Sequence, residues 1–433
     1  MWKSLFLVCA AAAVSLNAAP VLHVAADRAD ALYRKGEPIS FQISLTDDGR
    51  PLASQKVNWE FFGDDAVRGR GTLVTDAAGK AVLVRKLDRP GFMRCRAEAV
   101  IDGKKISGSG GAGVEPQNIT PARPTPADFD AFWNQQKAEL DALPVEAELR
   151  EVPPNRPGLE GRVKVYDFSV ACPGGRPVRG YLALPVGAKP KSLPGQIFFH
   201  GAGVGGSNMP LGAALSGRIA VDINAHGIEN GQPKEFYQNL LKGELRNYRY
   251  DGCTSREQSY FRGMFRRLYR ALQFLKSRPE WDGRILIATG TSQGGGQALV
   301  AAGLDPDVTC CVAHVPALCD HGGITIGRES GWPRFHWRKE GRTPEAIAAS
   351  DYVDAVNFAK RIKNAECFLS TGFVDLSCTP SSVYAAFNSI PSPRKQIVNN
   401  VASDHTVPRA CYQASNKFET EHIRKMRNAE VSK

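Results

Sequence analysis

The segment Gly290-Thr291-Ser292-Gln293-Gly294 points more directly to chemistry than any other part of this sequence. An apolar segment, RILIATG, runs into it, and a small-residue segment, GGGQALVAAGL, runs out of it. We expect the first to be a strand and the second a helix, which is the setting in which a G-x-S-x-G turn presents a serine hydroxyl. The glycines at both ends allow close backbone approach. The motif therefore predicts a nucleophile at Ser292.

A serine hydroxyl is a weak nucleophile, so the chain should also supply a histidine base. In proteins with a serine in this setting, the acid and then the histidine follow the serine along the chain. His405 is best placed, because it follows a strand candidate in the loop VASDHTVP. His314 lies in an apolar strand candidate and is expected in the core, whereas His422 is expected on the surface of the last helix.

A carboxylate must orient the histidine and stabilise its charged form. Asp375 ends the strand candidate CFLSTGF and lies far enough before His405 for one helix and one strand to intervene. Asp354, in a helical stretch, is the weaker alternative, and Asp404 is too close along the chain to reach back to the ring. The sequence therefore predicts a triad of Ser292, Asp375 and His405.

Negative charge that develops on a reacting carbonyl oxygen needs two backbone N–H donors, each of which contributes about 3 kcal/mol. Gln293, the residue after the nucleophile, is expected to supply one donor. The second is expected from the loop His200-Gly201-Ala202-Gly203, which follows an early strand candidate, with the N–H of Ala202 as the donor. His200 itself is expected to be a structural hydrogen-bonding residue.

These residues lie in a part of the chain, residues 127–433, whose pattern indicates an α/β architecture. Near-continuous apolar strand candidates alternate there with helical segments. The candidates span residues 195–201, 218–224, 284–290, 310–317, 367–373 and 395–401. Strands that are apolar on both sides indicate a mostly parallel sheet covered by helices on both faces, and with the serine motif they predict the α/β-hydrolase fold.

Residues 20–114 show a different pattern, in which apolar and polar positions alternate over short runs such as FQISL, VNWEF and AVLVRKL. Turn sequences separate these runs, so we predict an all-β, immunoglobulin-like sandwich. A glycine- and serine-rich stretch and then a proline-rich stretch mark its end, and residues 115–126 are predicted as a linker. The sandwich has no catalytic cluster, and it either spaces the catalytic part or binds carbohydrate or a partner.

Residues 1–19 predict a secretory signal peptide, because Lys3 precedes an apolar run of signal-peptide length and small residues suited to cleavage follow. No later apolar run approaches the length of a membrane span. We therefore expect a secreted or periplasmic protein with no membrane association once the signal is removed.

The formal net charge is +11, but the basic residues are spread along the chain, which argues against nucleic-acid binding. Four arginines have helical spacing within one segment: Arg262, Arg266, Arg267 and Arg270. A solvated helix face would account for them. The chain has no CxxC pair and no phosphate-binding loop, so we expect neither a metal nor a cofactor. The adjacent Cys310 and Cys311 are expected as buried thiols.

Several segments, in this order, resemble the acetyl xylan esterase / cephalosporin C deacetylase family, carbohydrate esterase family 7. They are ADFDAFW, VRGYLALP, FFHGAGVGG, SYFRGMFRRLYRALQFLKSRPEWDGRILIATGTSQGG and NFAKRIKNAECFLSTGFVDLSCTPSSVYAAFNSI. The resemblance implies the same triad roles for Ser292, Asp375 and His405 and the same second oxyanion donor, Ala202. Three positions differ from the family pattern: Asn224-Ala225-His226-Gly227 replaces Arg-Gly-Gln, Ala202 replaces a tyrosine, and Thr406 replaces a glutamate after the histidine.

The resemblance implies a serine esterase that removes acetyl groups from xylan or xylo-oligosaccharides through an acyl-enzyme, and it is compatible with a homo-oligomer. A prolyl-oligopeptidase-like peptidase, a different ester hydrolase and a non-catalytic glycan-binding protein are the alternatives. The candidates for substrate contact are three aromatic residues and one histidine: Trp332, Phe335, Trp337 and His226. The aromatic residues would either stack on sugar rings or pack within a cap loop.

Overall fold

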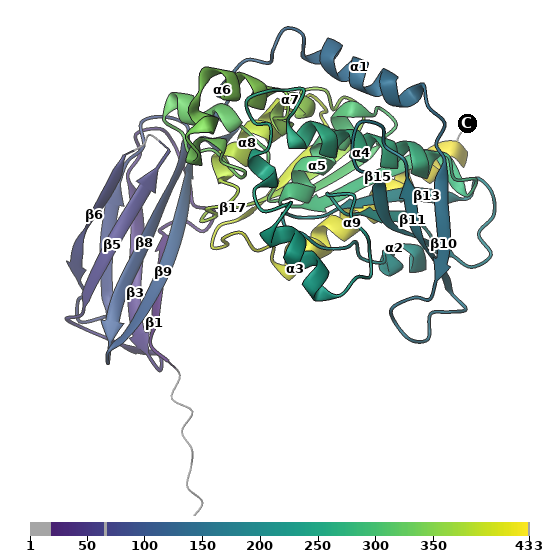
Figure 1. Cartoon of the computed structure of the whole chain (residues 1–433). Coiled ribbons are helices and arrows are strands. Elements are labelled where there is room, and N and C mark those ends of the chain that lie inside the picture. The colour runs from purple at the N-terminus through teal and green to yellow at the C-terminus, as the bar shows by residue number, and fades with distance from the viewer. Residues whose placement is uncertain (1–18, 65–66, 432–433) are drawn as a thin grey trace, which may run out of the picture.

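The computed structural model describes residues 19–64 and 67–431. The predicted signal peptide, residues 1–19, therefore lies outside the described residues except for its last position. Within the described ranges, no helix is both long enough and apolar enough to cross a bilayer. Figure 1 shows an all-β part at the N-terminus and a larger α/β part after it.

The N-terminal part consists of two β-sheets. One contains β1 (Val21–Ala26), β3 (Ile39–Asp47), β4 (Arg50–Pro51) and β7 (Lys80–Arg85). The other, in the order β2-β9-β8-β5-β6, contains β2 (Leu32–Tyr33), β5 (Lys56–Gly63), β6 (Arg68–Val74), β8 (Gly91–Ile101) and β9 (Lys104–Val114). Strand pairing is antiparallel except between β2 and β9.

The two sheets share one apolar core because side chains alternate between the two faces of each strand. In β3, Phe41, Ile43 and Leu45 are buried, whereas the residues between them are partly or fully exposed. These side chains belong to the same buried cluster as Cys95 and Ala97 of β8 in the other sheet. The N-terminal part is therefore all-β, as the alternating sequence pattern predicts.

The larger part is built on one mixed sheet with the strand order β10-β11-β12-β14-β13-β15-β16-β17-β18. The strands are β10 (Ala147–Val152), β11 (Val163–Val170), β12 (Val178–Pro185), β13 (Leu193–Phe199), β14 (Ile219–Ile223), β15 (Trp281–Thr291), β16 (Cys310–His314), β17 (Glu366–Gly372) and β18 (Lys395–Asn400). The pairs from β10 to β14 are antiparallel, and those from β14 to β18 are parallel. The strand candidates from the sequence are confirmed as the parallel region, whereas the antiparallel edge was not foreseen.

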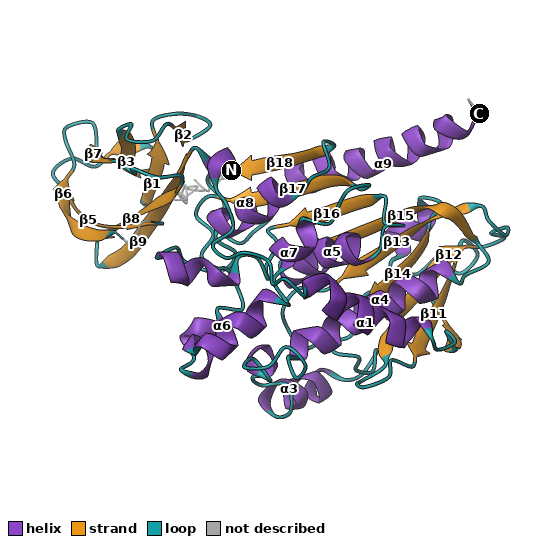
Figure 2. Ribbon diagram, turned by 90° about the horizontal axis from the view of Figure 1, so that it is seen from above, coloured by secondary structure: helices purple, strands orange, loops and turns teal. Residues whose placement is uncertain are grey.

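Helices cover both faces of this sheet (Figure 2). On one face, the main core includes residues of α1 (Phe129–Asp141), α4 (Tyr260–Lys276), α5 (Gln293–Leu304), α7 (Ala355–Ala359) and α8 (Pro380–Ser389). Residues of α2 (Leu211–Leu215) and α9 (Arg409–Val431) contribute to two smaller clusters on the other face. The connections also contain α3 (Lys234–Lys242), α6 (Pro344–Asp351), η1 (Pro116–Asn118), η2 (Tyr248–Tyr250), η3 (His321–Ile326), η4 (Phe335–Trp337) and η5 (Glu340–Arg342).

The central strands are buried on both sides, which explains their continuous apolar sequence. In β16, Cys310 and Val312 pack in the cluster that contains α9, whereas Cys311 and Ala313 pack in the cluster that contains α5. The expectation of buried thiols at these positions is confirmed. The nine cysteines in the described part of the chain are all free and buried.

The two parts of the chain are in close contact. The Phe92 ring of β8 lies 4.9 Å from the ring of Phe373, which follows β17. A Cβ atom on Gly111 of β9 would lie only 2.6 Å from the carbonyl oxygen of Phe373. Ser381 of α8 donates a hydrogen bond to Asp64 at 3.3 Å. The N-terminal part therefore packs directly against the ends of elements that belong to the mixed sheet and its helices.

The expectation of a solvated arginine face on α4 is wrong, because Arg266, Arg267 and Arg270 are buried. Arg270 is only 1% exposed, and its Nε donates to the carbonyl of Ala171 at 3.1 Å. Its Nη1 donates to the carbonyls of Leu140 and Leu143 at 3.2 Å. Carbonyls at a helix end lack intrahelical partners, so the guanidinium supplies donors to the end of α1 and the loop after it.

We expect replacement of Arg270 by Met to lower the free energy of unfolding by about 3 kcal/mol, because buried carbonyls would lose their donors. Chemical denaturation followed by fluorescence measures this loss. Arg150→Met is the matched control: its side chain is 76% exposed and pairs with Asp167, so the loss should be about 1 kcal/mol or less. Equal losses in both variants would contradict the structural role of Arg270.

Candidate active site

Ser292 lies in the turn between β15 and α5, and its backbone has a φ of 60°. A positive φ is uncommon for a residue other than glycine and persists only where surrounding contacts hold it. The N–H of Ser292 donates to the carbonyl of His314 at 2.9 Å. The carbonyl of Ser292 accepts from Gly296 at 3.0 Å and from Ala317 at 2.9 Å. These hydrogen bonds fix the turn and therefore the direction of the serine side chain.

The two motif glycines are required by close packing around this turn. A Cβ atom on Gly290 would lie 2.2 Å from backbone atoms of Gly294. A Cβ atom on Gly294 would lie 2.1 Å from the carbonyl oxygen of Phe199, at the end of β13. Neither position can accept a side chain unless the backbone moves. The sequence interpretation of these glycines as sites of close approach is confirmed.

Two hydrogen bonds join the three residues predicted as a triad. Ser292 Oγ lies 2.9 Å from His405 Nε2, and His405 Nδ1 lies 2.8 Å from Asp375 Oδ2. Because an ionised carboxylate can only accept, we infer that Nδ1 carries the proton and that Nε2 accepts from the serine hydroxyl. The order serine, histidine, carboxylate is the one in which the histidine can take the serine proton.

The topology of the sheet brings these residues together. Ser292 follows β15, Asp375 follows β17, and His405 follows β18. These strands are parallel, so their carboxyl ends lie at the same edge of the sheet. Residues separated by more than a hundred positions in the sequence therefore meet at one edge.

Asp375 is fully buried, yet it is well supplied with hydrogen-bond donors. Its Oδ1 accepts from the backbone N–H of Ser377 at 2.7 Å and from that of Cys378 at 3.0 Å. Its other oxygen accepts from His405. A buried carboxylate with three donors keeps one orientation, so it can hold the imidazole ring in place.

The carboxylate also sets the protonation of the base. The hydrogen bond from His405 to Asp375 raises the pKa of His405, and partial burial of the ring opposes this shift. The negative charge of Asp375 adds to the rise. An imidazole with a raised pKa is a stronger proton acceptor, which suits a base that must take a proton from a hydroxyl.

One predicted oxyanion donor adjoins the nucleophile in sequence, and the loop that carries the other passes near it. Gln293 is the first residue of α5, so its N–H has no acceptor within the helix. The loop that contains Ala202 passes close to the serine, because a Cβ atom on Gly201 would lie 3.9 Å from the Cβ atom of Ser292. The side chain of Ala202 is exposed. His200 Nε2 donates a hydrogen bond to Asp222 Oδ1 at 2.5 Å, which fits its expected structural role.

The expectation that His226 contacts substrate is wrong. Its side chain is buried and holds the loop that contains Ala202. It is only 1% exposed. Burial lowers its pKa to about 4, so the ring is neutral. Its Nε2 lies 2.7 Å from the carbonyl of Gly203, which can only accept, and its Nδ1 accepts from the Tyr260 hydroxyl at 2.8 Å. Both nitrogens are therefore used within the protein.

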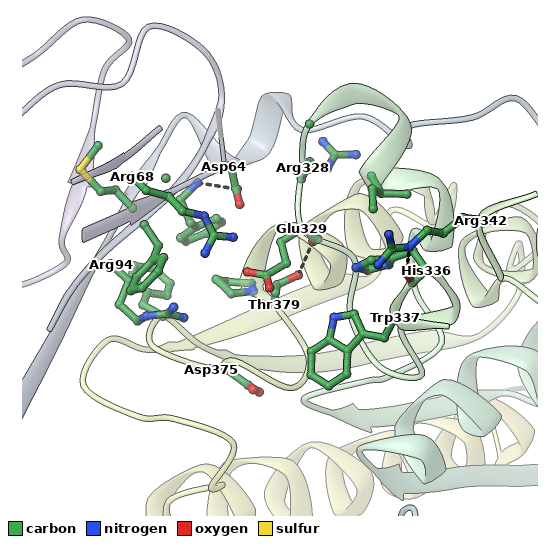
Figure 3. A pocket seen from close by; sticks show the side chains of 18 residues that line it. Asp64, Arg68, Arg94, Arg328, Glu329, His336, Trp337, Arg342, Asp375 and Thr379 are labelled. Carbon is green, nitrogen blue, oxygen red and sulfur yellow. Dashed lines mark hydrogen bonds between the residues drawn. The ribbon is translucent and has the colours of Figure 1, made fainter. Parts of the chain in front are cut away.

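The aromatic candidates separate into packed and exposed residues. Trp332 is half-buried against Phe261 and Tyr248, with ring centroids 5.8 Å and 6.3 Å away. Phe335 is buried. Trp337 is 54% exposed and lines a pocket between the two parts of the chain (Figure 3). Cap-loop packing therefore accounts for Trp332 and Phe335, whereas Trp337 is available to a ligand.

The two other histidines considered from the sequence, His314 and His422, form hydrogen bonds away from the triad. His314 is buried in the core as expected, between the hydroxyls of Ser370 and Ser415. The expectation of a surface position for His422 is wrong, because it is only 3% exposed and bonds Thr309 at 3.0 Å. α9 packs this side chain against the sheet although most of the helix is polar.

The alternative acid, Asp354, does not reach the histidine base. It accepts hydrogen bonds from the backbone N–H groups of Asp320, His321 and Val356, and it caps α7. Burial raises its pKa to about 7. Its carboxylate is therefore a structural group in the connection between β16 and β17.

One neighbour of the site, Cys378, was not singled out as a site residue from the sequence. Its sulfur, a carboxylate oxygen of Asp375 and a ring nitrogen of His405 all lie within 4.8 Å of one another. Burial raises the pKa of the thiol well above its usual value, so it stays protonated beside the carboxylate. The only signal in the sequence was its spacing of three residues from Asp375.

Comparison with known proteins identifies relatives of most of the chain. The family model described as acetyl xylan esterase (AXE1) matches residues 115–422. Acetyl esterase Axe7A of Xylanibacter ruminicola is 30% identical over 392 residues, which cover 89% of this chain and 87% of that protein. That match is longer than the family model, so it extends into the N-terminal β-sheets.

Two solved structures match 71% of the chain. The acetyl xylan esterase from Paenibacillus sp. R4 is 27% identical with a TM-score of 0.60, and the match covers 71% of this chain and 98% of that one. Acetyl xylan esterase 1 from Thermoanaerobacterium sp. JW/SL YS485 covers the same shares at 23% identity and a TM-score of 0.57, which shows a common fold.

The geometry around His405 predicts how its ring titrates. We expect NMR titration to give a pKa above the usual value of about 6.5 for histidine. In an Asp375→Asn variant, the stabilising charge is lost while burial remains, so the pKa of His405 should fall below that value. An Asp404→Asn variant is the control, because Asp404 makes a smaller contribution and its hydrogen bonds go to Thr406. An unchanged pKa in Asp375→Asn would contradict the assignment.

Proposed function

This chain belongs to the acetyl xylan esterase family, and on that premise we propose that it deacetylates xylan or xylo-oligosaccharides through an acetyl-enzyme on Ser292. Membership makes it a carboxylic ester hydrolase. The observation that carries the proposed mechanism is the continuous line of hydrogen bonds from Ser292 through His405 to Asp375.

In the first half of the reaction, Ser292 Oγ attacks the acetyl carbonyl carbon while His405 Nε2 takes the hydroxyl proton. The carbonyl oxygen becomes an oxyanion and accepts hydrogen bonds from the N–H groups of Gln293 and Ala202. The intermediate collapses, the bond to the sugar oxygen breaks, and His405 returns the proton to that oxygen. The products are a free sugar hydroxyl and an acetyl ester on Ser292.

In the second half, a water molecule takes the place of the sugar. His405 Nε2 accepts a proton from this water, which attacks the acetyl carbon. A second tetrahedral intermediate then collapses, acetate leaves, and the proton returns to Ser292 Oγ. Asp375 stabilises the imidazolium in both halves, since its carboxylate is fully buried and bonded to the ring.

We also propose the finer assignments of architecture and location. Residues 20–114 are assigned as an immunoglobulin-like domain, residues 115–126 as a linker, and residues 127–433 as an α/β-hydrolase domain. Two facing sheets support the first assignment, and a serine turn after a parallel strand supports the last. We propose that residues 1–19 direct export and are removed, so that the protein is secreted or periplasmic; the sequence alone supports this step.

Replacing Ser292 with Ala tests the mechanism. We expect acetate release from acetylated xylan to fall by about 10⁶-fold, because nothing else in the triad can form the acyl-enzyme. Ser192→Ala is the matched control. Ser192 precedes β13, whereas the loop near Ser292 follows that strand, and the Ser192 hydroxyl donates a hydrogen bond to the carbonyl of Lys189. Acetate release by Ser292→Ala at the wild-type rate would refute the nucleophile.

The same assay separates the proposed activity from its alternatives. The wild-type chain should release acetate from acetylated xylo-oligosaccharides and should not cleave proline-containing peptides. Peptide cleavage without acetate release would favour a peptidase on this scaffold. Failure of both, together with failure of a fluorophosphonate probe to label Ser292, would favour a non-catalytic binding protein.

A further inference from the structure

A pocket lies where the N-terminal sheets meet the α/β part, next to the proposed catalytic acid (Figure 3). Its volume is about 440 Å³, which is within the usual range for sites that hold small molecules. Arg68 and Arg94 line it from β6 and β8, and Glu329, Trp337 and Arg342 line it from the connection between β16 and β17. Neither part of the chain forms this pocket alone.

The N-terminal wall presents two guanidinium groups to this space. The guanidinium carbons of Arg68 and Arg94 lie 5.1 Å and 5.0 Å from the ring centroid of Phe62. Among residues 19–64 and 67–431, neither side chain forms an ion pair with a carboxylate. Figure 3 shows both side chains directed from their strands into the pocket. The wall therefore carries two guanidinium groups that have no ion-pair partner among the described residues.

A third guanidinium lies behind the opposite wall. Arg334 is only 9% exposed, and its Nε and Nη2 have no hydrogen-bond acceptor among the residues that the structure describes. Its guanidinium carbon lies 4.6 Å from the ring centroid of Trp337, and its Nη1 lies 3.8 Å from Glu329. A buried guanidinium with unused donors is costly unless an anion approaches it.

The carboxylates at this pocket offset these cations only in part. Glu329 forms a long ion pair with Arg334 at 3.8 Å, and its charge also acts on Arg94, so one carboxylate serves two guanidinium groups. Asp64 bonds the N–H of Phe92, and burial raises its pKa to about 6, while Asp375 is bonded to His405. Arg328 is already paired with Asp320, so it neither adds to nor reduces the excess. The pocket therefore favours an anion.

The shape and chemistry of the walls narrow the type of anion. Guanidinium groups bind carboxylates with paired, charge-assisted hydrogen bonds. The exposed indole of Trp337 offers a flat apolar surface of the kind on which a sugar ring stacks. A sugar that bears a carboxylate would satisfy both walls at once.

A groove adjoins this pocket and extends to the loop that carries the histidine of the proposed triad. It has a volume of about 680 Å³ and shares Arg68, Arg94 and Glu329 with the pocket. Its far side includes Asp404 and Thr406, which flank His405 in sequence. A branched polysaccharide could therefore place one substituent in the pocket while another part of the same chain reaches Ser292.

We propose that this pocket binds a uronic acid substituent of the acetylated polysaccharide, with Arg68 and Arg94 as carboxylate ligands and Trp337 as the stacking surface. This inference rests on the proposed function for the identity of the polysaccharide. It gives the N-terminal sheets a direct part in substrate choice, and it predicts that acetyl groups near acidic branches are preferred.

Binding measurements test the pocket without any need for catalysis. The probes are an unacetylated xylo-oligosaccharide with one glucuronic acid branch and the same compound with its carboxyl group reduced to the neutral alcohol. By calorimetry on the full chain at low salt, we expect the acidic probe to bind about tenfold more tightly. An Arg68→Gln, Arg94→Gln double variant should lose this difference while it still binds the neutral probe.

Arg150→Gln removes one positive charge from an exposed position on β10, so it controls for the loss of an arginine outside the pocket and should keep the tenfold difference. Equal affinities of the wild-type chain for the two probes would overturn the proposal, and so would a double variant that keeps the preference. Loss of binding to both probes by the double variant would also count against it, because the arginines would then not be specific for the carboxylate.

A kinetic comparison separates this inference from the proposed function. With acetylated forms of the two probes, we expect a KM about tenfold lower for the acidic one and a similar kcat. Acetate release from both with equal KM would reject the uronic acid site and leave the esterase intact. No acetate release from either, with tenfold tighter binding of the acidic probe, would reject the esterase activity and support the site.

Discussion

The close approach of the nucleophile turn to the neighbouring strand is the constraint on which the site depends. Gly294 lies so near the carbonyl of Phe199 that no side chain fits between them. Because of this contact, α5 begins at the residue after Ser292 while the loop after β13 passes close to the same serine. One short distance between two backbones thus places the nucleophile and both proposed oxyanion donors.

The parallel order of the strands then places the other two residues of the proposed triad. β16 separates β15 from β17, and β18 lies beyond β17, so the loops that carry Asp375 and His405 open at the same edge as the serine turn. The buried strands are apolar on both sides, and this makes the sheet rigid. A rigid edge holds three loop residues at hydrogen-bonding distance, as efficient proton transfer requires.

The sequence was informative wherever structure follows from local pattern. The serine turn and the parallel strands were predicted because apolar runs and glycine spacing are local signals. Arg270 and His422 were misjudged for the opposite reason: each has polar partners supplied by distant segments, and periodicity alone cannot distinguish a polar residue with buried partners from a solvated one. The role of His226 and the pocket between the two parts depend on how separate segments pack, so neither could be foreseen.

The contact between Gly111 and Phe373 has a consequence for how such proteins can be recombined. With 2.6 Å between a hypothetical Cβ and a carbonyl oxygen, only a residue without a side chain is tolerated at that strand position. A foreign β-module that replaced the N-terminal sheets would need a glycine at the position of Gly111. That position faces the backbone of Phe373, two residues before Asp375. A graft at this boundary therefore succeeds only where this glycine and the backbone of Phe373 are kept as a matched pair.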